Sequence, residues 1–318
     1  MVSLRKLQLL APILVLSVNG GCQPQTPVVQ EVVVLAGGNA QSFWTYDLDT
    51  DTWSTLPDVP GAIGPGGALA QLQRLGAIYA LRGGGTTDFY RLDMNAGVWS
   101  QLAATPGPVN AGGALVGINY GTQSQRDRLY ALQGGGSTSV WDYDVASNAW
   151  TTIAQVPEPV GDGGGIASPN IGQEGTLELI AGGGSTRVHR LDVASGTWST
   201  LGAAPAPVLA GGSIFNLFNS CDYAFTGGGS TAFFSTGTLC TSAGSLAATP
   251  APVMAGAGVT AAPGLGGVQA DWVFATRGGG TTDFWRYSIS ADSWSAMAAT
   301  PGPISVGGAI VEVRPFAP

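Results

Sequence analysis

The chain has 318 residues, of which 44% are hydrophobic, 10% are charged and 50 are glycine. This composition, with many Thr, Ser, Val and Trp residues, favours short strands and tight turns over helices. Nine tryptophans and regular apolar runs argue against a disordered chain. With a formal net charge of −8 and 12 Lys+Arg, the chain has no basic patch to neutralise a phosphate backbone, which excludes nucleic acid as a partner.

The first 22 residues predict an export signal. Arg5 and Lys6 precede an apolar stretch over residues 7–18 that is too short to span a bilayer. Cys22 follows two glycines, which resembles a bacterial lipoprotein signal and implies lipid attachment to Cys22, although Asn19 stands where that family usually has leucine. The alternative is simple cleavage and secretion. Residues 23–30 are expected to form a short tether, so membrane contact would occur only through the anchor on Cys22. The resemblance implies a periplasmic, outer-membrane or cell-surface lipoprotein, or a secreted protein.

Residues 31–318 contain six copies of one repeat and are expected to form a single domain. Runs of glycine begin at residues 37, 83, 134, 182, 227 and 278, at spacings of 46, 51, 48, 45 and 51 residues. The position fourteen residues after the third residue of each run holds Trp in five copies and Ala243 in the other, and a proline and then a glycine follow at constant distances. These landmarks are Trp53, Trp99, Trp150, Trp198 and Trp294, then Pro60, Pro106, Pro157, Pro205, Pro250 and Pro301, then Gly66, Gly112, Gly163, Gly211, Gly256 and Gly307.

Each copy predicts four short strands rich in β-branched and aromatic residues and bounded by Gly, Pro and Asn. In the second copy these are "AIYALR", "DFYRLD", "GVWSQL" and "GGALVGI". Three features resemble the kelch repeat over roughly residues 31–314. They are the glycine run that follows the second strand of each four-stranded unit and, in the second copy, Asp93 and Trp99. The resemblance implies an all-β, six-bladed kelch-like β-propeller with four-stranded antiparallel blades. Aspartate at one fixed place per repeat predicts turn capping rather than catalysis: Asp47, Asp93, Asp144 and Asp192.

The phase of the repeat predicts how the ring closes. The first copy begins at its second strand, "EVVVLAGG", and the chain ends with the extra segment "GGAIVEV" at residues 307–313. We therefore expect the C-terminal strand to pair with the first blade and remove an open sheet edge.

The fifth copy lacks the repeated Asp and Trp and contains Cys221 and Cys240. Because the two cysteines fall at the same end of the predicted blade in an exported chain, a disulfide between them is expected. Closing a loop of about 20 residues would contribute on the order of 3 kcal/mol. The alternative is two buried free thiols.

The sequence predicts no metal, cofactor or catalytic residues. His189 is the only histidine, and it occupies a strand position where other copies have aromatic residues. Kelch-like copper oxidases, which the chain resembles in fold, need more than one histidine, so their activity is not implied. A Ser-His or Cys-His triad has little support, and no CxxC pairing suggests zinc.

Candidate binding residues are polar residues that break the repeat. The loops after the prolines lead to the innermost strands, so Asn110, Asp162 and Ser305 are expected near the central opening, where they could line a small polar pocket. Ordinary loop polarity is the alternative. Arg187 has no acid opposite it, because Ala181 stands there, whereas Arg82–Asp88 and Arg277–Asp283 are expected to be cross-strand pairs. Arg187 is therefore a candidate anion contact.

These observations predict a non-catalytic binding or interaction module at the bacterial cell envelope, monomeric, with an unknown protein or carbohydrate partner. The alternative is a carbohydrate-active kelch-type enzyme, such as a sugar epimerase or mutarotase. An enzyme should have a central funnel with several converging charged groups. A binding scaffold should have a small or apolar opening and an exposed loop or aromatic patch.

Overall fold

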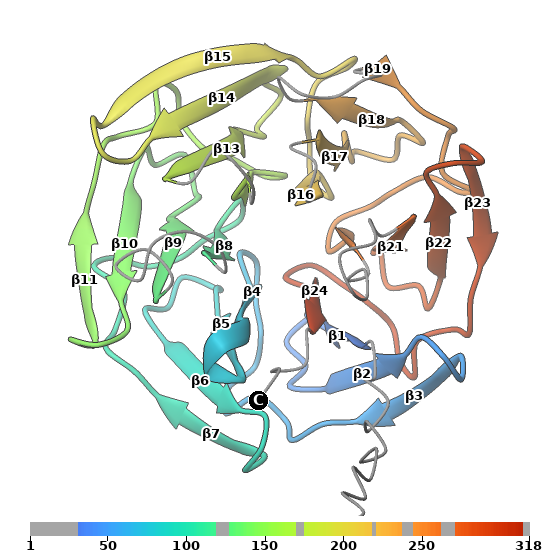
Figure 1. Cartoon of the computed structure of the whole chain (residues 1–318), viewed down its shortest axis with the longest axis horizontal. Helices are drawn as coiled ribbons and strands as arrows, with labels where there is room; N and C mark the ends of the chain where they lie inside the picture. The colour runs from blue at the N-terminus through green and yellow to red at the C-terminus, as the bar shows by residue number, and fades with distance from the viewer. Residues whose placement is uncertain are drawn as a thin grey trace, which may run out of the picture.

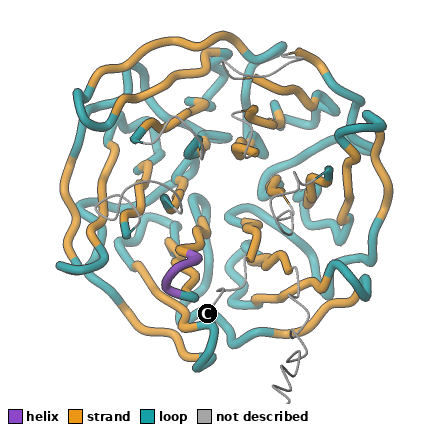
Figure 2. The backbone as a smooth tube through the Cα atoms, in the orientation of Figure 1, coloured by secondary structure: helices purple, strands orange, loops and turns teal. Residues whose placement is uncertain are grey.

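The computed structural model describes residues 31–118, 127–169, 175–217, 221–236, 244–261 and 271–313. Within these ranges the chain forms six four-stranded antiparallel sheets arranged as blades around a central axis (Figure 1). Strands and their connecting loops make up nearly the whole backbone (Figure 2), with one 3₁₀ turn, η1 (Gln73–Leu75). No helix in the described ranges is long and apolar enough to cross a membrane. The fold is therefore the predicted six-bladed β-propeller.

Each blade runs outward from the axis through four strands. In this order, blade 1 contains β24 (Ala309–Val313), β1 (Glu31–Leu35), β2 (Phe43–Asp47) and β3 (Thr52–Thr55). Blade 2 contains β4 (Ala68–Leu72), β5 (Ala77–Leu81), β6 (Phe89–Asp93) and β7 (Val98–Gln101). Blade 3 contains β8 (Ala114–Gly117), β9 (Arg128–Leu132), β10 (Val140–Asp144) and β11 (Ala149–Thr152).

The other three blades follow the same order. Blade 4 contains β12 (Gly165–Ala167), β13 (Thr176–Ile180), β14 (Arg187–Asp192) and β15 (Thr197–Ala203). Blade 5 contains β16 (Ser213–Leu217), β17 (Cys221–Phe225), β18 (Phe233–Thr236) and the short β19 (Gly244–Ser245). Blade 6 contains β20 (Gly258–Ala261), β21 (Trp272–Thr276), β22 (Phe284–Ser288) and β23 (Ser293–Ala296).

Ring closure occurs through the C-terminal strand, as the phase of the repeat predicts. β24 pairs antiparallel with β1, with Glu31 opposite Val313 and Leu35 opposite Ala309. In Figure 1 the red β24 lies beside the blue β1, so the two ends of the domain meet in one blade.

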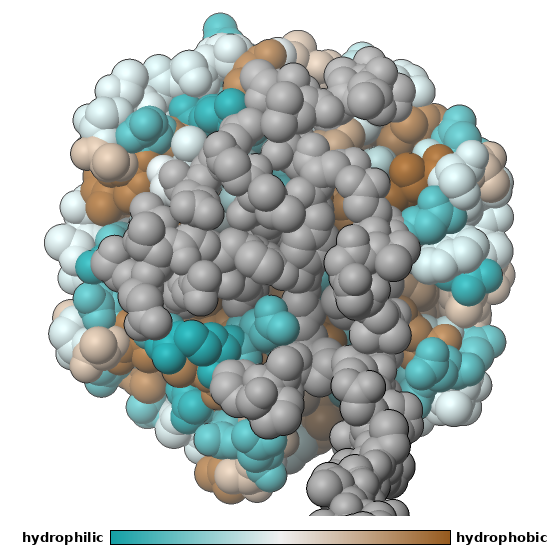
Figure 3. All heavy atoms as spheres, viewed as in Figure 1, coloured by the Kyte–Doolittle hydropathy of each residue, from teal (hydrophilic) through white to brown (hydrophobic). Residues whose placement is uncertain are grey.

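The hydrophobic core is divided among the blades instead of forming one central mass. In the described ranges, each of six buried clusters joins side chains of two adjacent blades. Both faces of every sheet are therefore covered, which explains why the middle strands are continuous apolar runs such as "AIYAL". The rim of the ring carries hydrophilic residues interspersed with apolar ones (Figure 3).

The repeated aspartates cap turns, as predicted. Oδ1 of Asp93 accepts hydrogen bonds from the backbone N–H groups of Asn95 and Ala96, both at 3.0 Å. Asp47, Asp144 and Asp192 make equivalent bonds in their blades. These carboxylates are therefore occupied by the fold.

The repeated tryptophans fasten adjacent blades together. In blade 6, Trp294 packs against Phe233 of blade 5, with ring centroids 5.0 Å apart, and its Nε1 donates to the carbonyl of Ala247 at 2.9 Å. Asp292, whose φ is 44°, holds the same Ala247 by accepting its N–H at 2.8 Å, and it also accepts the Tyr287 hydroxyl at 2.6 Å. The Trp and Asp side chains thus form a two-point fastener between blades.

Replacing Asp292 tests this fastener. The Tyr287 hydroxyl, followed by the Ala247 N–H, lowers the pKa of Asp292 below its ordinary value. The carboxylate therefore stabilises the fold above the pKa of the unfolded chain, and this contribution is lost as the pH falls below about 4. We expect Asp292→Ala to cost about 1 kcal/mol at pH 6, allowing for solvent screening, and less at pH 3. Asp292→Asn should cost less, since Asn148 accepts the equivalent bonds in blade 3. Urea unfolding at both pH values measures this, and an Ala variant as stable as wild type at pH 6 would refute the fastener.

Candidate functional site

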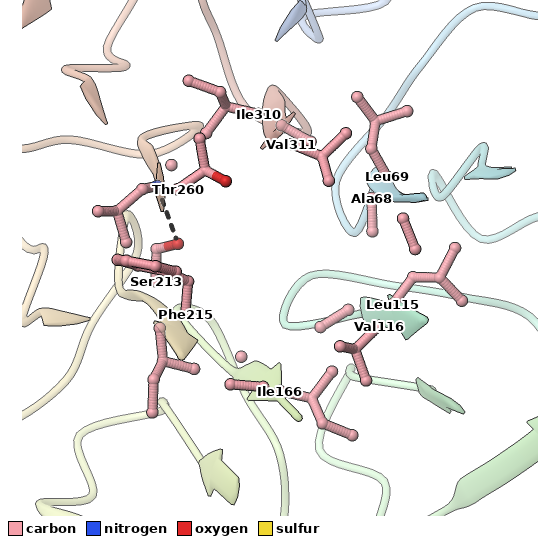
Figure 4. Close-up of a pocket in the computed structure, with 18 of the residues that line it drawn as sticks. Ala68, Leu69, Leu115, Val116, Ile166, Ser213, Phe215, Thr260, Ile310 and Val311 are labelled. Atoms are coloured by element: carbon pink, nitrogen blue, oxygen red, sulfur yellow. Dashed lines mark hydrogen bonds between the residues drawn. The ribbon is translucent and has the colours of Figure 1, made fainter. Parts of the chain in front are cut away.

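The innermost strands of the six blades surround an axial channel. Its main cavity has a volume of about 220 Å³ and is lined by residues of β24, β4, β8, β12, β16 and β20. Figure 4 shows labelled side chains from these strands arranged around an open centre. Each inner strand pairs with only one neighbour in its blade, so its other backbone edge faces the axis. Side chains of adjacent blades satisfy part of this edge: Ser213 accepts the N–H of Val259 at 3.3 Å, and Thr260 accepts that of Glu312 at 3.1 Å.

One mouth of the channel lies on the face formed by the six glycine turns, which we call the glycine-turn face. A second cavity of about 140 Å³ opens there. It is bordered by the repeated glycines after the prolines, all with φ between 84° and 93°. A Cβ on Gly112 would lie 2.0 Å from the carbonyl oxygen of Gly161 in the next connection, and the other five glycines are as crowded. These six residues form the mouth ring: Gly66, Gly112, Gly163, Gly211, Gly256 and Gly307.

The triple-glycine turns do not form an anion cradle. The N–H of Gly84 donates to the Pro65 carbonyl within its own blade, and that of Gly85 donates to the Val109 carbonyl of the connection into the next blade, both at 2.8 Å. The same two bonds recur in each of the other blades. The N–H groups equivalent to that of Gly84 belong to Gly38, Gly135, Gly183, Gly228 and Gly279, and those equivalent to that of Gly85 belong to Asn39, Gly136, Gly184, Gly229 and Gly280. Because these amides are already hydrogen-bonded, the turns hold the ring together and leave no nest for phosphate.

The three predicted pocket residues occupy two different environments. Asp162 is exposed and lines the mouth cavity. The side chain of Asn110 donates to the Pro108 carbonyl at 3.2 Å and lies against Gly135, and Ser305 lies against Gly38. Asn110 and Ser305 are therefore at seams between blades, outside the residues that line the mouth. Two residues precede each mouth-ring glycine in its connection. Asp162 is the second of these two residues, whereas Asn110 and Ser305 are each the first. This one-residue difference decides which way the side chain projects.

Arg187 has an acidic neighbour that local spacing in the sequence does not indicate. Its side chain is 64% exposed, and Nη1 lies 3.4 Å from Oε2 of Glu158. Oε1 of the same carboxylate contacts Nε2 of the buried His189 at 2.6 Å and accepts the Ser185 hydroxyl at 2.9 Å. Burial acts to raise the pKa of Glu158, but hydrogen bonds from His189 and Ser185 and the charge of Arg187 outweigh it, so the pKa is lowered.

This cluster replaces an apolar contact made in other blades. Glu158 stands where the other connections have Gly or Ala, and His189 stands where other blades have Trp, Tyr or Phe. In blade 3, for example, Gly107 packs against Trp141. Comparison of the six copies shows that Glu158 departs from the repeat, although the spacing of residues does not indicate which side chain Glu158 contacts. The predicted pairs Arg82–Asp88 and Arg277–Asp283 are present, at 2.7 and 2.9 Å.

Three exposed aliphatic side chains lie beside the mouth, and no sequence pattern singles them out. They belong to consecutive connections, lead into blades 5, 6 and 1, and are 40–43% exposed: Leu209, Met254 and Val306. We call them the apolar triplet. Leu209 lies over Gly228, Met254 lies over Gly279, and Val306 lines the mouth cavity. Asp162 is the one ionisable side chain among the described residues that line this mouth.

The opposite end of the channel has a different character. In four of the six blades, the fifth position after the mouth-ring glycine, in or directly after the inner strand, holds a polar residue: Gln71, Ser168, Asn216 and Glu312. Burial raises the pKa of Glu312 to about 8. The channel therefore runs from a glycine-rich mouth, where Asp162 is the one ionisable described side chain, to an end lined by polar side chains, which we call the polar end. Its residues break the repeat, as Asn110 and Asp162 do in the connections, but the sequence-based prediction did not include them.

Two of the predicted modification sites fall outside the described residues, namely Cys22 and Cys240. Cys221 at the start of β17 is disulfide-bonded. Its pairing with Cys240 remains a prediction.

No family model matches the chain, and no curated protein matches it. In the described part of the chain, no group of three or more His, Cys, Asp or Glu side chains is placed to hold a metal ion. The fold and the channel thus define the chain as a six-bladed β-propeller whose axial channel has a glycine-rich mouth and a polar end.

Proposed function

We propose that this propeller is a kelch-type, non-catalytic binding module that is exported, held at the bacterial cell envelope through Cys22, and uses its glycine-turn face to recognise a protein partner. The fold is consistent with such a role because propellers offer rigid faces for recognition.

The observation that carries the proposal is the apolar triplet. The other three connections have Gly64, Asn110 and Gly161 at or next to the equivalent positions, so the fold does not require aliphatic side chains there. Exposed apolar side chains in consecutive connections of one face are typical of protein contact sites. A glycan site would more often combine polar groups with an aromatic platform, so a protein partner is favoured.

The position of the chain ends supports the choice of face. Glu31 pairs with Val313 at the ends of β1 and β24 that lie away from the glycine turns. A tether over residues 23–30 would therefore join the propeller on the opposite face. Its eight residues reach at most about 28 Å when extended. With an anchor on Cys22, the glycine-turn face would point away from the membrane.

A carbohydrate-active enzyme is less well supported. General acid–base chemistry on a sugar needs two ionisable groups that converge on one reacting bond. Among the described residues lining the channel, the carboxyl groups are Asp162 at the mouth and Glu312 at the polar end.

Charged substitutions in the triplet test the proposal. We expect the Leu209→Asp/Met254→Asp double variant of residues 23–318 to lose at least about tenfold in affinity for its partner, because central apolar contacts each contribute about 1–2 kcal/mol or more. The partner is first captured from the envelope fraction of the producing cells by quantitative cross-linking. The affinity of wild type and of the double variant is then measured with the purified partner.

The matched control is Val98→Asp, since Val98 is 60% exposed but lies on the outer strand of blade 2. It should leave binding unchanged. If both variants bind the same proteins as wild type with equal affinity, the glycine-turn face is not the recognition surface. Binding on a glycan array that the double variant loses would change the partner class.

A further inference from the structure

The seam between blades 4 and 5 lacks the tryptophan that packs into each of the other five seams. At those five seams the repeated tryptophan belongs to the buried cluster that joins the two blades. The fifth copy has Ala243 at this place in the sequence. Among the described residues, the cluster that joins blades 4 and 5 contains one aromatic side chain, Phe234, and no tryptophan. This seam is therefore packed without the ring that the repeat supplies elsewhere.

A cavity of about 290 Å³ lies at this seam. It is lined by the end of β15 and by β18 and β19, and Figure 1 shows β15 and β19 as neighbours on the rim of the ring. One of its lining residues is Thr236, which corresponds to Tyr287 in blade 6. Tyr287 is the cross-strand partner of Trp294. The cavity therefore lies where the tryptophan of blade 5 would stand.

The outer strands on both sides of this cavity also differ from those at the other seams. Gly202 of β15 corresponds to Ala247, whose N–H and carbonyl are held by Asp292 and Trp294 of the next blade. Gly202 instead pairs with Val188 of its own blade, and a Cβ on Gly202 would have no atom within 4 Å. On the other side, β19 has only two residues, both exposed. The two outer strands thus leave the cavity open to the rim.

The other seams identify the kind of group that fits this place. Phe234 corresponds to Trp285 of blade 6 and Trp141 of blade 3. These two residues meet the repeated tryptophans of their blades with ring centroids 6.2 and 6.3 Å apart. Residues 237–243, which join β18 to β19, contain no aromatic residue, so this connection supplies no ring for Phe234. A cavity that lacks a large apolar side chain can bind a free ring, as a cavity of about 150 Å³ binds benzene.

We propose that the seam between blades 4 and 5 binds a small aromatic ligand of the indole class in the place of the missing tryptophan, with its ring against Phe234 and Leu201. The cavity lies just below the roughly 300–1,000 Å³ of sites for drug-sized ligands, which leaves room for two fused rings. No Lys, Arg, His, Asp or Glu is among the described residues that line it, which favours an uncharged ligand. The site shares no lining residue with the axial channel or its mouth, so it does not depend on a partner at the glycine-turn face.

The test uses two probes, indole and cyclooctanol, titrated separately into residues 23–318 and followed by NMR. The two molecules have the same number of non-hydrogen atoms, but only indole is aromatic. We expect one indole to bind saturably, with Kd of about 1 mM or lower and with NOE contacts to Phe234 and Leu201. The ring contact with Phe234 should make indole bind roughly 2- to 10-fold more tightly than cyclooctanol.

Two substitutions in the cavity wall separate aromatic recognition from simple filling of space. Phe234→Leu keeps an apolar wall but removes the ring, so it should lose the preference for indole over cyclooctanol. Leu201→Trp places a larger side chain at the cavity and should abolish indole binding at this seam. Melting curves show whether each variant is folded, and Phe234→Leu keeps the test decisive if Leu201→Trp does not fold.

Trp99→Ala is the matched positive control, because it opens the equivalent place between blades 1 and 2. Trp99 packs there against Phe43, with ring centroids 5.7 Å apart. This variant should bind a second indole, and indole should raise its melting temperature more than that of wild type. The proposal is overturned if wild type binds no indole, even where Trp99→Ala binds one. Equal affinity for indole and cyclooctanol, NOE contacts at a different place, or an indole affinity that both wall variants leave unchanged would also overturn it.

Discussion

Deletion of residues 306–318 is expected to leave no cooperatively folded protein. β24 supplies the innermost strand of blade 1, and its five residues pair with all five of β1. Ile310 and Val313 are each 9% exposed and belong to the clusters that join blade 1 to blades 6 and 2. Without β24, both seams lose contacts and β1 becomes an open sheet edge. A loss on this scale is comparable to the total stability of about 5–15 kcal/mol of a natural domain.

A circular permutant distinguishes loss of the strand from general damage to the chain. Because Val313 lies opposite Glu31, residues 306–313 can be placed before residue 31 through a short turn. We expect this chain, ending at residue 305, to regain the wild-type circular-dichroism spectrum and a single unfolding transition. The closure would be refuted if the deletion variant unfolds at the wild-type midpoint, or if the permutant fails to restore folding.

The fold was predictable because each landmark of the repeat has a physical cause that acts in every blade. The glycine turns exchange hydrogen bonds with neighbouring connections, Asp93 and its equivalents cap turns, and Trp294 and its equivalents reach the preceding blade. A cause repeated six times leaves a pattern that can be counted. The extra strand at the end of the chain then predicts the closure.

The candidate sites were less predictable because they depend on departures from the repeat. Asn110 and Asp162 differ by one position in the connection, and only Asp162 reaches the mouth. Arg187 lacked a partner by local spacing, but Glu158, 29 residues earlier, supplies one. The sequence reveals that such residues are unusual. Their contacts depend on how two blades pack, which no single repeat encodes.

Glu312 and the apolar triplet were not predicted at all. Glu312 lies in the segment that predicts ring closure, and nothing in that pattern distinguishes its side chain. Leu209, Met254 and Val306 are apolar residues in a chain that is 44% hydrophobic, and only the structure shows that they are exposed. Burial is predicted from the regular spacing of apolar residues in helices and strands. The connections have no such regular spacing, so the sequence does not indicate whether an aliphatic side chain there is exposed.

Gly112→Ala is expected to be among the most damaging single substitutions in the described chain. Gly112 has φ of 85°, and a Cβ there would lie 2.0 Å from the carbonyl oxygen of Gly161. That oxygen is backbone and cannot rotate away, so the two connections must separate. The positive φ alone costs about 1–3 kcal/mol in a non-glycine residue, and the clash adds to it. We expect a total loss of about 4 kcal/mol or more in the free energy of unfolding, measured by urea denaturation.

Gly136→Ala is the matched control, and the comparison isolates the cause. Gly136 has a similar φ of 79°, but no atom would lie within 4 Å of its Cβ. It should therefore show only the conformational cost, about 1–3 kcal/mol. If the two variants lose equal stability, close packing at the mouth ring is not what requires glycine in all six copies, and positive φ alone explains the landmark. If Gly112→Ala loses more, the mouth of the channel is held by contact between neighbouring backbones, and the side chains around it are free to vary for binding.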